Sequence, residues 1–186
     1  MPHQNTNISL YQESQAKDNC GFGLIVNRHG IQNRDVVKRS IVGLTSMTHR
    51  GAIGADGKTG DGCGLLFDLN QTFFKKQIKK ELKISLPELF GIAQIFSSSD
   101  LKKDLPAIKA ILKSENLIFE CVREVPINID VLGEIALESL PKINQIFITP
   151  ISKDFNKERF ESCLLQARKK MEELHNNDEK LSLIHI

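Results

Sequence analysis

A glycine-rich segment constrains the fold of this chain more than any other feature. Residues 51–64 read GAIGADGKTGDGCG and hold six of the twelve glycines in the 186-residue sequence. Glycine weakens the interior of helices and strands, and it adopts backbone conformations that other residues avoid. We therefore predict that residues 51–64 form a loop of tight turns rather than a regular element.

Hydrophobic periodicity predicts regular elements on both sides of this loop. A stripe of apolar residues predicts a helix over 34–49, and Gly51 is placed to end it. Similar patterns predict further helices at 70–83, 101–114, 131–140 and 154–175. Short apolar runs predict strands at 20–26, 64–69, 90–97, 117–124 and 143–149, with the start of another strand at 181–186. Alternation of strands and helices by itself favours an α/β fold with a parallel sheet.

Composition excludes several classes of partner. Lys and Arg number 25 against 23 Asp and Glu, so net charge gives no reason to expect nucleic acid or a membrane surface as a partner. No apolar stretch approaches the ~20 residues of a bilayer-spanning helix. The four cysteines are widely spaced and residues 1–19 do not resemble a signal peptide, which favours reduced thiols and a cytoplasmic location.

Local motifs for nucleotides and metals are incomplete. Gly57-Lys58-Thr59 resembles the end of a phosphate-binding loop, but that pattern needs a glycine at position 52, which is alanine. Asp56 and Asp61 lack the spacing of a calcium loop, and no cysteine pair has metal-ligand spacing. We therefore expect the loop to be structural and packed against the strand predicted at residues 20–26.

Two segments carry a family resemblance. Residues 18–26 read DNCGFGLIV and residues 49–64 read HRGAIGADGKTGDGCG. Both resemble the start of a class II glutamine amidotransferase domain, and more narrowly that of the large subunits of glutamate synthases. Residues 132–136 and 141–145, LGEIA and PKINQ, add weaker similarity. The resemblance implies an α+β fold, a four-layer αββα sandwich of the N-terminal-nucleophile hydrolases with mostly antiparallel sheets, in place of the parallel sheet.

The resemblance also implies a division of the chain and a nucleophile. Residues 1–19 would be a propeptide, and residues 20–186 would be the N-terminal portion of the amidotransferase domain. Once the propeptide is removed, Cys20 would attack the side-chain amide of glutamine. Its own α-amino group, with a pKa of ~7.7–8.0, would serve as general base for a thiol with a pKa near ~8.5. Without this motif, a lone cysteine is more often a buried core residue.

Two further residues have expected roles at Cys20. Arg50 matches the family's arginine beside the nucleophile, and it continues the helical stripe that includes Met47. A cation near a thiol lowers the thiol's pKa, so we expect Arg50 to organise the site electrostatically. Gly21 would leave space for substrate beside the sulfur. A rival Cys20–His49 dyad lacks a cysteine-protease signature, so we expect His49 to be structural.

The resemblance covers residues from about 10 to about 180 and implies further groups for the full-length enzyme. These are FMN and an iron–sulfur cluster, 2-oxoglutarate as ammonia acceptor, and a small (beta) subunit or ferredoxin as electron source; we expect no cofactor or metal in this chain itself. No Asn-Gly pair, the family's oxyanion-hole signature, occurs in the sequence, so we expect the chain alone to be nearly inactive. Two alternatives are another class II amidotransferase and an inactive amidotransferase-like interaction module.

Overall fold

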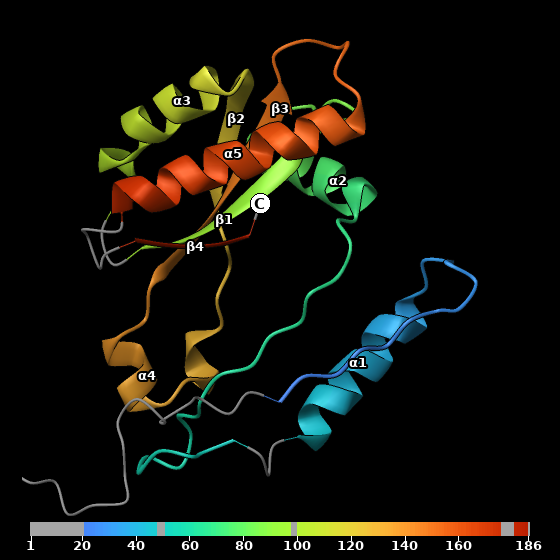
Figure 1. Cartoon of the computed structure of the whole chain (residues 1–186). Coiled ribbons are helices and arrows are strands. Elements are labelled where there is room, and N and C mark those ends of the chain that lie inside the picture. Colours follow the sequence, from blue (N-terminus) through green and yellow to red (C-terminus); the bar gives the residue numbers. More distant parts are fainter. Residues whose placement is uncertain (1–20, 48–50, 98–99, 176–180, 186) are drawn as a thin grey trace, which may run out of the picture. The chain divides into compact units, whose positions relative to one another are not determined.

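The structure is a computed structural model that describes residues 21–47, 51–97, 100–175 and 181–185. It divides into two compact units. One comprises Met1–Ala52 and Gly60–Leu66, and the other comprises Ile53–Thr59 and Phe67–Ile186. Figure 1 shows the course of the chain and the labelled elements.

The first unit contains one described helix, α1 (Arg34–Ser46). Its N-terminus is capped by Asn33, whose side-chain oxygen accepts a hydrogen bond from the Asp35 amide at 2.9 Å. Asp35 also pairs with Arg39 one turn later at 2.6 Å. The predicted helix over 34–49 is thus confirmed as far as Ser46, and the expected end near Gly51 comes earlier, with Met47 as C-cap.

Two predicted strands are wrong. The structure assigns no strand to residues 21–26 or to residues 64–69. The side chains of Phe22 and Leu66 are 94% and 77% exposed. A strand exists through ladder hydrogen bonds to a neighbour, and the described residues supply none for either segment.

The second unit is built on a four-stranded sheet. Its strands are β1 (Gly91–Ser97), β2 (Leu117–Glu124), β3 (Lys142–Pro150) and β4 (Leu181–His185), in the spatial order β2-β3-β1-β4. All neighbouring strands are antiparallel. The parallel sheet favoured by periodicity is therefore wrong, and the sheet is antiparallel, as the family resemblance implied.

The connections explain why periodicity failed here. The helices α3 (Leu105–Ser114) and α5 (Lys157–His175) each join two strands that run in the same direction, as in a parallel sheet. In both cases, however, another strand lies between the two joined strands: β3 between β1 and β2, and β1 between β3 and β4. This is the split β-α-β arrangement, in which helical crossovers coexist with antiparallel neighbours.

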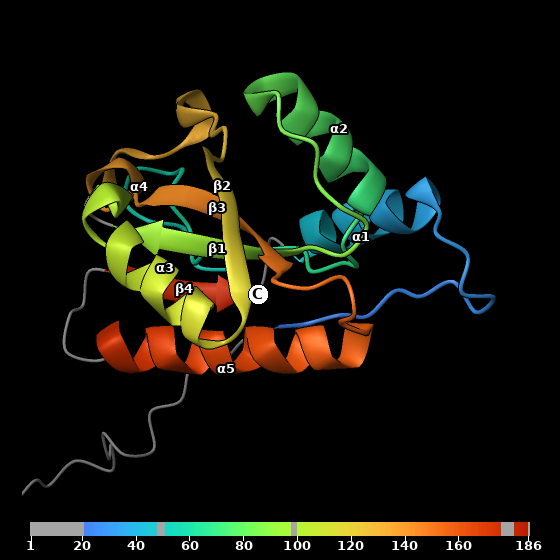
Figure 2. The ribbon, with the colours of Figure 1, turned by 90° about the horizontal axis from the view of Figure 1, so that it is seen from above.

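The sheet buries different side chains on its two faces. On one face, Ala93 and Ile95 of β1 and Ile146 and Ile148 of β3 form the larger core with α3 and α5. Figure 2 shows these two helices covering that face. Successive side chains of a strand point to opposite faces, so Phe147 lies on the other face. There it packs with Cys121, Leu86, Phe90 and Ile78, the last from α2 (Gln71–Leu82).

A polar row crosses the α2 side of the sheet. The Arg123 guanidinium, in a side chain that is 9% exposed, donates to both Glu81 carboxylate oxygens at 2.8 and 3.2 Å. It also donates to the Gln145 side-chain oxygen at 3.0 Å, and the Gln145 amide donates to Gln94 at 3.2 Å. Hydrogen bonds from Gln77 and then Arg123 lower the pKa of Glu81. The strand registers explain this row, because Gln145 of β3 lies opposite Gln94 of β1 and opposite Arg123 of β2.

The remaining elements agree with the predicted ones in type. The helix predicted over 101–114 is divided into a 3-10 turn, η3 (Leu101–Lys103), and α3, with Pro106 in the first helical positions. The short helix predicted at 131–140 is α4 (Glu134–Glu138), preceded by the 3-10 turn η4 (Ile129–Val131). Pro106 suits the first turn of α3, because a backbone N–H at that position would have no acceptor within the helix.

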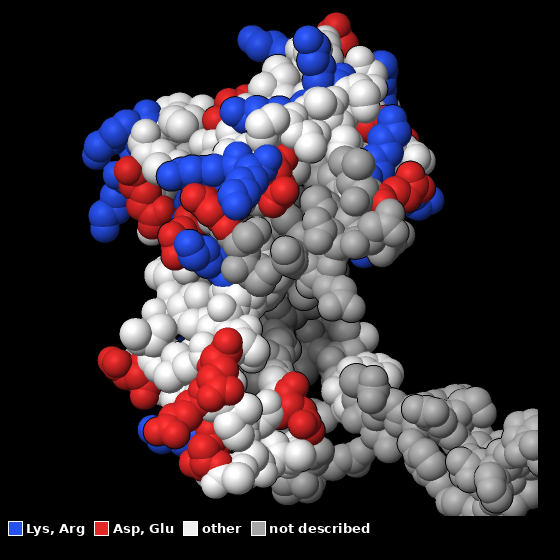
Figure 3. Space-filling model, turned by 90° about the vertical axis from the view of Figure 1, so that its left-hand side faces the viewer, with Lys and Arg blue, Asp and Glu red and all other residues white. Residues whose placement is uncertain are grey.

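Part of the surface of the second unit is mixed in charge. Figure 3 shows Lys and Arg side chains interspersed with Asp and Glu over the upper part of one face, where α3 and the end of α5 lie. None of the helices that the structure describes combines the length and apolar character of a membrane span.

Candidate active site

The two expected catalytic residues, Cys20 and Arg50, lie outside the described residues, as does His49. Their described neighbours lie close together in the first unit. A Cβ added at Gly21 would lie 2.6 Å from the terminal methyl of Met47, the residue that ends α1. Gly21 follows Cys20 directly, and Met47 precedes Arg50 by three residues. The chain segments that lead to the expected nucleophile and the expected cation therefore meet at this point.

The segment after Gly21 runs alongside α1. Ile25 approaches Gly43, where an added Cβ would lie 3.9 Å from the Ile25 Cδ1 atom. Residue 21 thus lies near residue 47 and residue 25 near residue 43, which sets segment and helix antiparallel. The absence of a side chain at Gly21 permits the close approach to Met47, since even a methyl group would force the methionine to move.

The glycine-rich loop has an internal anchor in the first unit. The Ala52 amide donates to the Asp61 carboxylate at 2.9 Å. A Cβ on Gly60 would lie 3.2 Å from the Ala52 carbonyl oxygen, so the two sides of the loop are closely apposed here. Gly62, with φ of +82°, then takes a left-handed conformation that favours glycine. The Asp61 carboxylate therefore serves the loop's own backbone.

In the second unit, residues 53–59 form a turn organised by Asp56. One carboxylate oxygen accepts hydrogen bonds from the Lys58 and Thr59 amides at 3.0 and 2.8 Å, and the other accepts from the Thr59 hydroxyl at 2.5 Å. The Gly54 amide donates to the Thr59 carbonyl at 2.6 Å, which closes the turn. Gly57, with φ of +67°, lies in the left-handed region. A turn of this kind is typical of aspartate followed by glycine.

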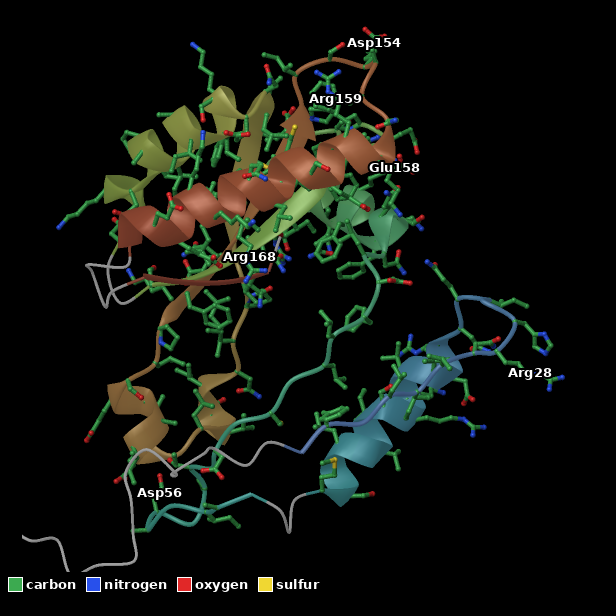
Figure 4. The ribbon with its side chains drawn as sticks, viewed as in Figure 1. Arg28, Asp56, Asp154, Glu158, Arg159 and Arg168 are labelled. Carbon is green, nitrogen blue, oxygen red and sulfur yellow. The ribbon has the colours of Figure 1, made fainter. Side chains whose placement is uncertain are left out.

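This turn packs against α4 rather than against a strand. The second carboxylate oxygen of Asp56 also accepts from the Ile135 amide at 3.4 Å, and the Thr59 hydroxyl accepts from the Ala136 amide at 3.3 Å. Figure 4 shows Asp56 near α4. Gly133, the N-cap residue of α4, has no side chain to cap the helix. Asp56 and Thr59 supply the acceptors that the helix N-terminus needs.

The environment of Asp56 favours its ionised form. The Thr59 hydroxyl, followed by the Thr59 and Lys58 amides, holds the pKa of this carboxyl well below its usual range. Hydrogen bonds to a carboxylate stabilise the charged state. Among the described residues no group of three His, Cys, Asp or Glu side chains could hold a metal ion. The hydrogen bonds that Asp56 and Asp61 accept from the protein give both side chains a structural role.

The sequence contained a signal for this contact that the prediction missed. The loop and residues 132–136 each carried family similarity, but their contact with each other was not predicted. Asp56 and Thr59 have the spacing of an Asx motif, and Gly133 precedes the helix without a capping side chain. An uncapped helix start and a turn rich in acceptors are complementary. Their separation of 77 and 79 residues kept the pairing out of reach of local patterns.

Comparison with known protein families decides the membership of the chain. Residues 20–185 match the family model described as "Glutamine amidotransferases class-II". The chain belongs to this family. The matched region begins at Cys20, the expected nucleophile, and includes the whole glycine-rich loop and α4.

Curated relatives narrow the resemblance. The chain is 35% identical over 168 residues to "Glutamate synthase [NADPH] large chain" of Bacillus subtilis (strain 168), covering 88% of this chain and 11% of that protein. It is 32% identical over 173 residues to "Glutamate synthase [NADH]" of Saccharomyces cerevisiae, covering 86% of this chain and 8% of the relative. "Ferredoxin-dependent glutamate synthase 1, chloroplastic/mitochondrial" of Arabidopsis thaliana is 34% identical over 157 residues, which cover 82% of this chain and 10% of that protein. The chain thus spans about a tenth of the length of these relatives.

Proposed function

We propose that this chain supplies the glutamine-hydrolysing site of a glutamate synthase. The observation that carries the proposal is the family match from residue 20 to residue 185, since it begins at a cysteine. Cys20 would become the N-terminal residue when residues 1–19 are removed as a propeptide. The remaining residues would form the N-terminal portion of the amidotransferase domain.

The proposed chemistry proceeds through a thioester. The Cys20 α-amino group takes the thiol proton, and the sulfur attacks the carbonyl carbon of the glutamine side-chain amide. The tetrahedral intermediate collapses when its nitrogen receives that proton and leaves as ammonia. Water then cleaves the thioester, which releases glutamate and restores the thiol. Arg50 would favour the thiolate by charge, and Gly21 would leave space for substrate beside the sulfur.

The ammonia would pass to 2-oxoglutarate elsewhere in the full-length enzyme. The printed names of the relatives include NADPH, NADH and ferredoxin, so a reduced nicotinamide acting through a small (beta) subunit, or ferredoxin, is the proposed electron source. FMN and an iron–sulfur cluster would supply the reducing chemistry. The family resemblance assigns both cofactors to other parts of the full-length enzyme. A cytoplasmic location fits the free thiols of Cys63, Cys121 and Cys163.

We further propose that the complete domain is a four-layer αββα sandwich. The exposed apolar segments support this, because Phe22 and Leu66 expose 94% and 77% of their side chains. Exposed apolar side chains of this kind are typical of a surface that other residues cover in a larger assembly. In the complete domain, further residues outside this chain would cover these exposed segments.

Substitution of Cys20 tests the proposed activity. In the full-length polypeptide that contains this chain, we expect Cys20→Ala to lower glutamine hydrolysis by about 10³-fold or more, because no other group replaces the nucleophile. Cys63→Ala is the matched control, since Cys63 is exposed. Equal activity of both variants would contradict the proposal. Glutamine hydrolysis without ammonia transfer to 2-oxoglutarate would instead support a different class II amidotransferase.

A further inference from the structure

We propose that Asp56 and Thr59 are positioning residues for glutamine hydrolysis, because they hold the turn at residues 53–59 against α4. The inference rests on the proposed function, since it assigns a role in that reaction. It adds two residues to a site for which Cys20, Arg50 and Gly21 were the expected members. Neither residue is expected to touch the substrate.

Both side chains have several hydrogen-bond partners at the contact. The Asp56 carboxylate accepts from the Lys58 and Thr59 amides, the Thr59 hydroxyl and the Ile135 amide, at 2.5 to 3.4 Å. The Thr59 hydroxyl donates to Asp56 and accepts from the Ala136 amide. A network in which every member has partners fixes one arrangement more firmly than separate bonds would.

Gly133 makes the close approach possible. A Cβ at this position would collide with the Asp56 carboxylate and the Thr59 hydroxyl, and it would lie 2.7 Å from the Thr59 amide nitrogen. The backbone φ of Gly133 is −78°, which any residue adopts, so the requirement for glycine is steric. The turn and the start of α4 are therefore complementary in both shape and hydrogen bonding.

The position of the turn in the sequence connects it with the reaction. Gly54, whose amide closes the turn, follows Arg50 by four residues. We expect an anchor at residues 54–59 to restrict the chain that follows Arg50, because only three residues separate Arg50 from Gly54. A misplacement of about 1 Å far from the chemistry can cost about 100-fold in rate, because the reacting groups lose their alignment. The Thr59 hydroxyl bond lowers the pKa of Asp56 further below neutral pH, so the anchor also withstands mild acid.

The experiment compares four variants of the full-length polypeptide. Asp56→Asn and Thr59→Val remove acceptors of the contact while nearly preserving side-chain shape, and Thr59→Ser keeps the hydroxyl. Asp130→Asn is the matched control, because Asp130 is exposed and its side chain takes no part in the contact. For each variant, kcat and KM for glutamine are measured. The kcat is expressed per Cys20 site, and the sites are counted by labelling with 6-diazo-5-oxo-norleucine.

We expect Asp56→Asn and Thr59→Val to lower kcat per labelled site by about 10-fold or more, as misalignment would. Thr59→Ser and Asp130→Asn should stay within about twofold of the unsubstituted protein, a change that corresponds to well under 1 kcal/mol. The pH at half-maximal rate should not move, because the nucleophile and its α-amino base are unchanged. Amide exchange at Ile135 and Ala136 should become faster in the first two variants, which verifies that the contact is lost.

Three results would overturn the inference. Faster exchange at Ile135 and Ala136 with an unchanged kcat per labelled site would show that the contact stabilises structure alone. A decrease confined to the number of labelled sites would indicate a role in folding. An equal loss of kcat in Asp130→Asn would remove the specificity of the effect. If the unsubstituted protein does not hydrolyse glutamine, the proposed function itself fails, and this role fails with it.

Discussion

At the scale of single residues, the charged side chain of Asp56 has a structural role. Its carboxylate accepts hydrogen bonds from a hydroxyl and three backbone amides, and these lower its pKa. A carboxyl with a depressed folded-state pKa contributes stability above its unfolded pKa of about 3.8 and loses it as pH falls toward the folded value. The contribution is therefore complete at neutral pH.

This predicts a specific response to acid. The turn at residues 53–59 should be unchanged between pH 7 and about 5, and its stabilisation by Asp56 should decline below about pH 4, near the unfolded pKa. The carboxyl carbon shift of Asp56 in an NMR titration reports its ionisation directly. Asp56→Asn should lack this part of the acid-induced decline in stability. A midpoint for Asp56 at or above its ordinary pKa would contradict the hydrogen-bond pattern.

Gly133 permits a steric test of the same contact. Gly133→Ala should release the turn from α4, because the new methyl group has no space between Asp56 and Thr59. We expect faster amide exchange at Lys58 and Thr59 and a lower Tm. Gly64→Ala is the control, since an added Cβ there meets nothing within 4 Å. Equal exchange rates in the two variants would show that the close approach at Gly133 is absent in solution.

At the scale of elements, the sheet depends on Phe147. This side chain is fully buried on the α2 face of β3, where it packs with Cys121, Ile78 and Phe90. We predict that Phe147→Ala lowers the free energy of unfolding by about 3–5 kcal/mol, through lost burial and a remaining cavity. Ile118→Ala, at a position 39% exposed on β2, should cost far less. Urea unfolding measures both, and similar losses would contradict the assigned core.

The sequence predicted the elements of the second unit well, because their signals are local. The strand over 117–124 matches β2 in its bounds, and the helix over 70–83 matches α2 within a residue at each end. It failed where a long-range partner decides the outcome. Residues 64–69 have the composition of a strand but no neighbour among the described residues, and the antiparallel pairing followed from the family resemblance rather than from periodicity.

The candidate site shows the same limit. Cys20 and Arg50 were proposed from motifs, whereas the contact of Asp56 and Thr59 with α4 joins segments more than 70 residues apart. The apolar pattern at residues 131–140 predicts a helix there, but it does not indicate which residues contact the start of that helix. The contact depends on backbone amides at the start of α4, which need acceptors, and on the Asp56 carboxylate and Thr59 hydroxyl, which accept from them. These groups can be recognised as partners only when the fold places them together.

At the scale of the whole molecule, this chain aligns with 8–11% of the length of each glutamate synthase that it resembles. Its sequence contains no Asn-Gly pair, the family's oxyanion-hole signature. We therefore predict that the 186-residue chain alone turns over glutamine at least about 100-fold more slowly than the full-length polypeptide, since loss of one oxyanion donor costs 10²–10³-fold in other enzymes. Glutamate release by both proteins under saturating glutamine measures this ratio. Comparable turnover would show that residues 20–186 contain a complete site.

Processing and labelling at Cys20 test the central claim most directly. The measurement is the intact mass of the purified full-length polypeptide before and after treatment with 6-diazo-5-oxo-norleucine, followed by peptide mapping. Removal of residues 1–19 and a single adduct on Cys20 are the predicted result, because the freed α-amino group and the thiol would act on one residue. An adduct on Cys20 with Met1 still attached would contradict the α-amino base and favour His49 in that role. An adduct on a different cysteine would contradict the assignment of Cys20 as nucleophile.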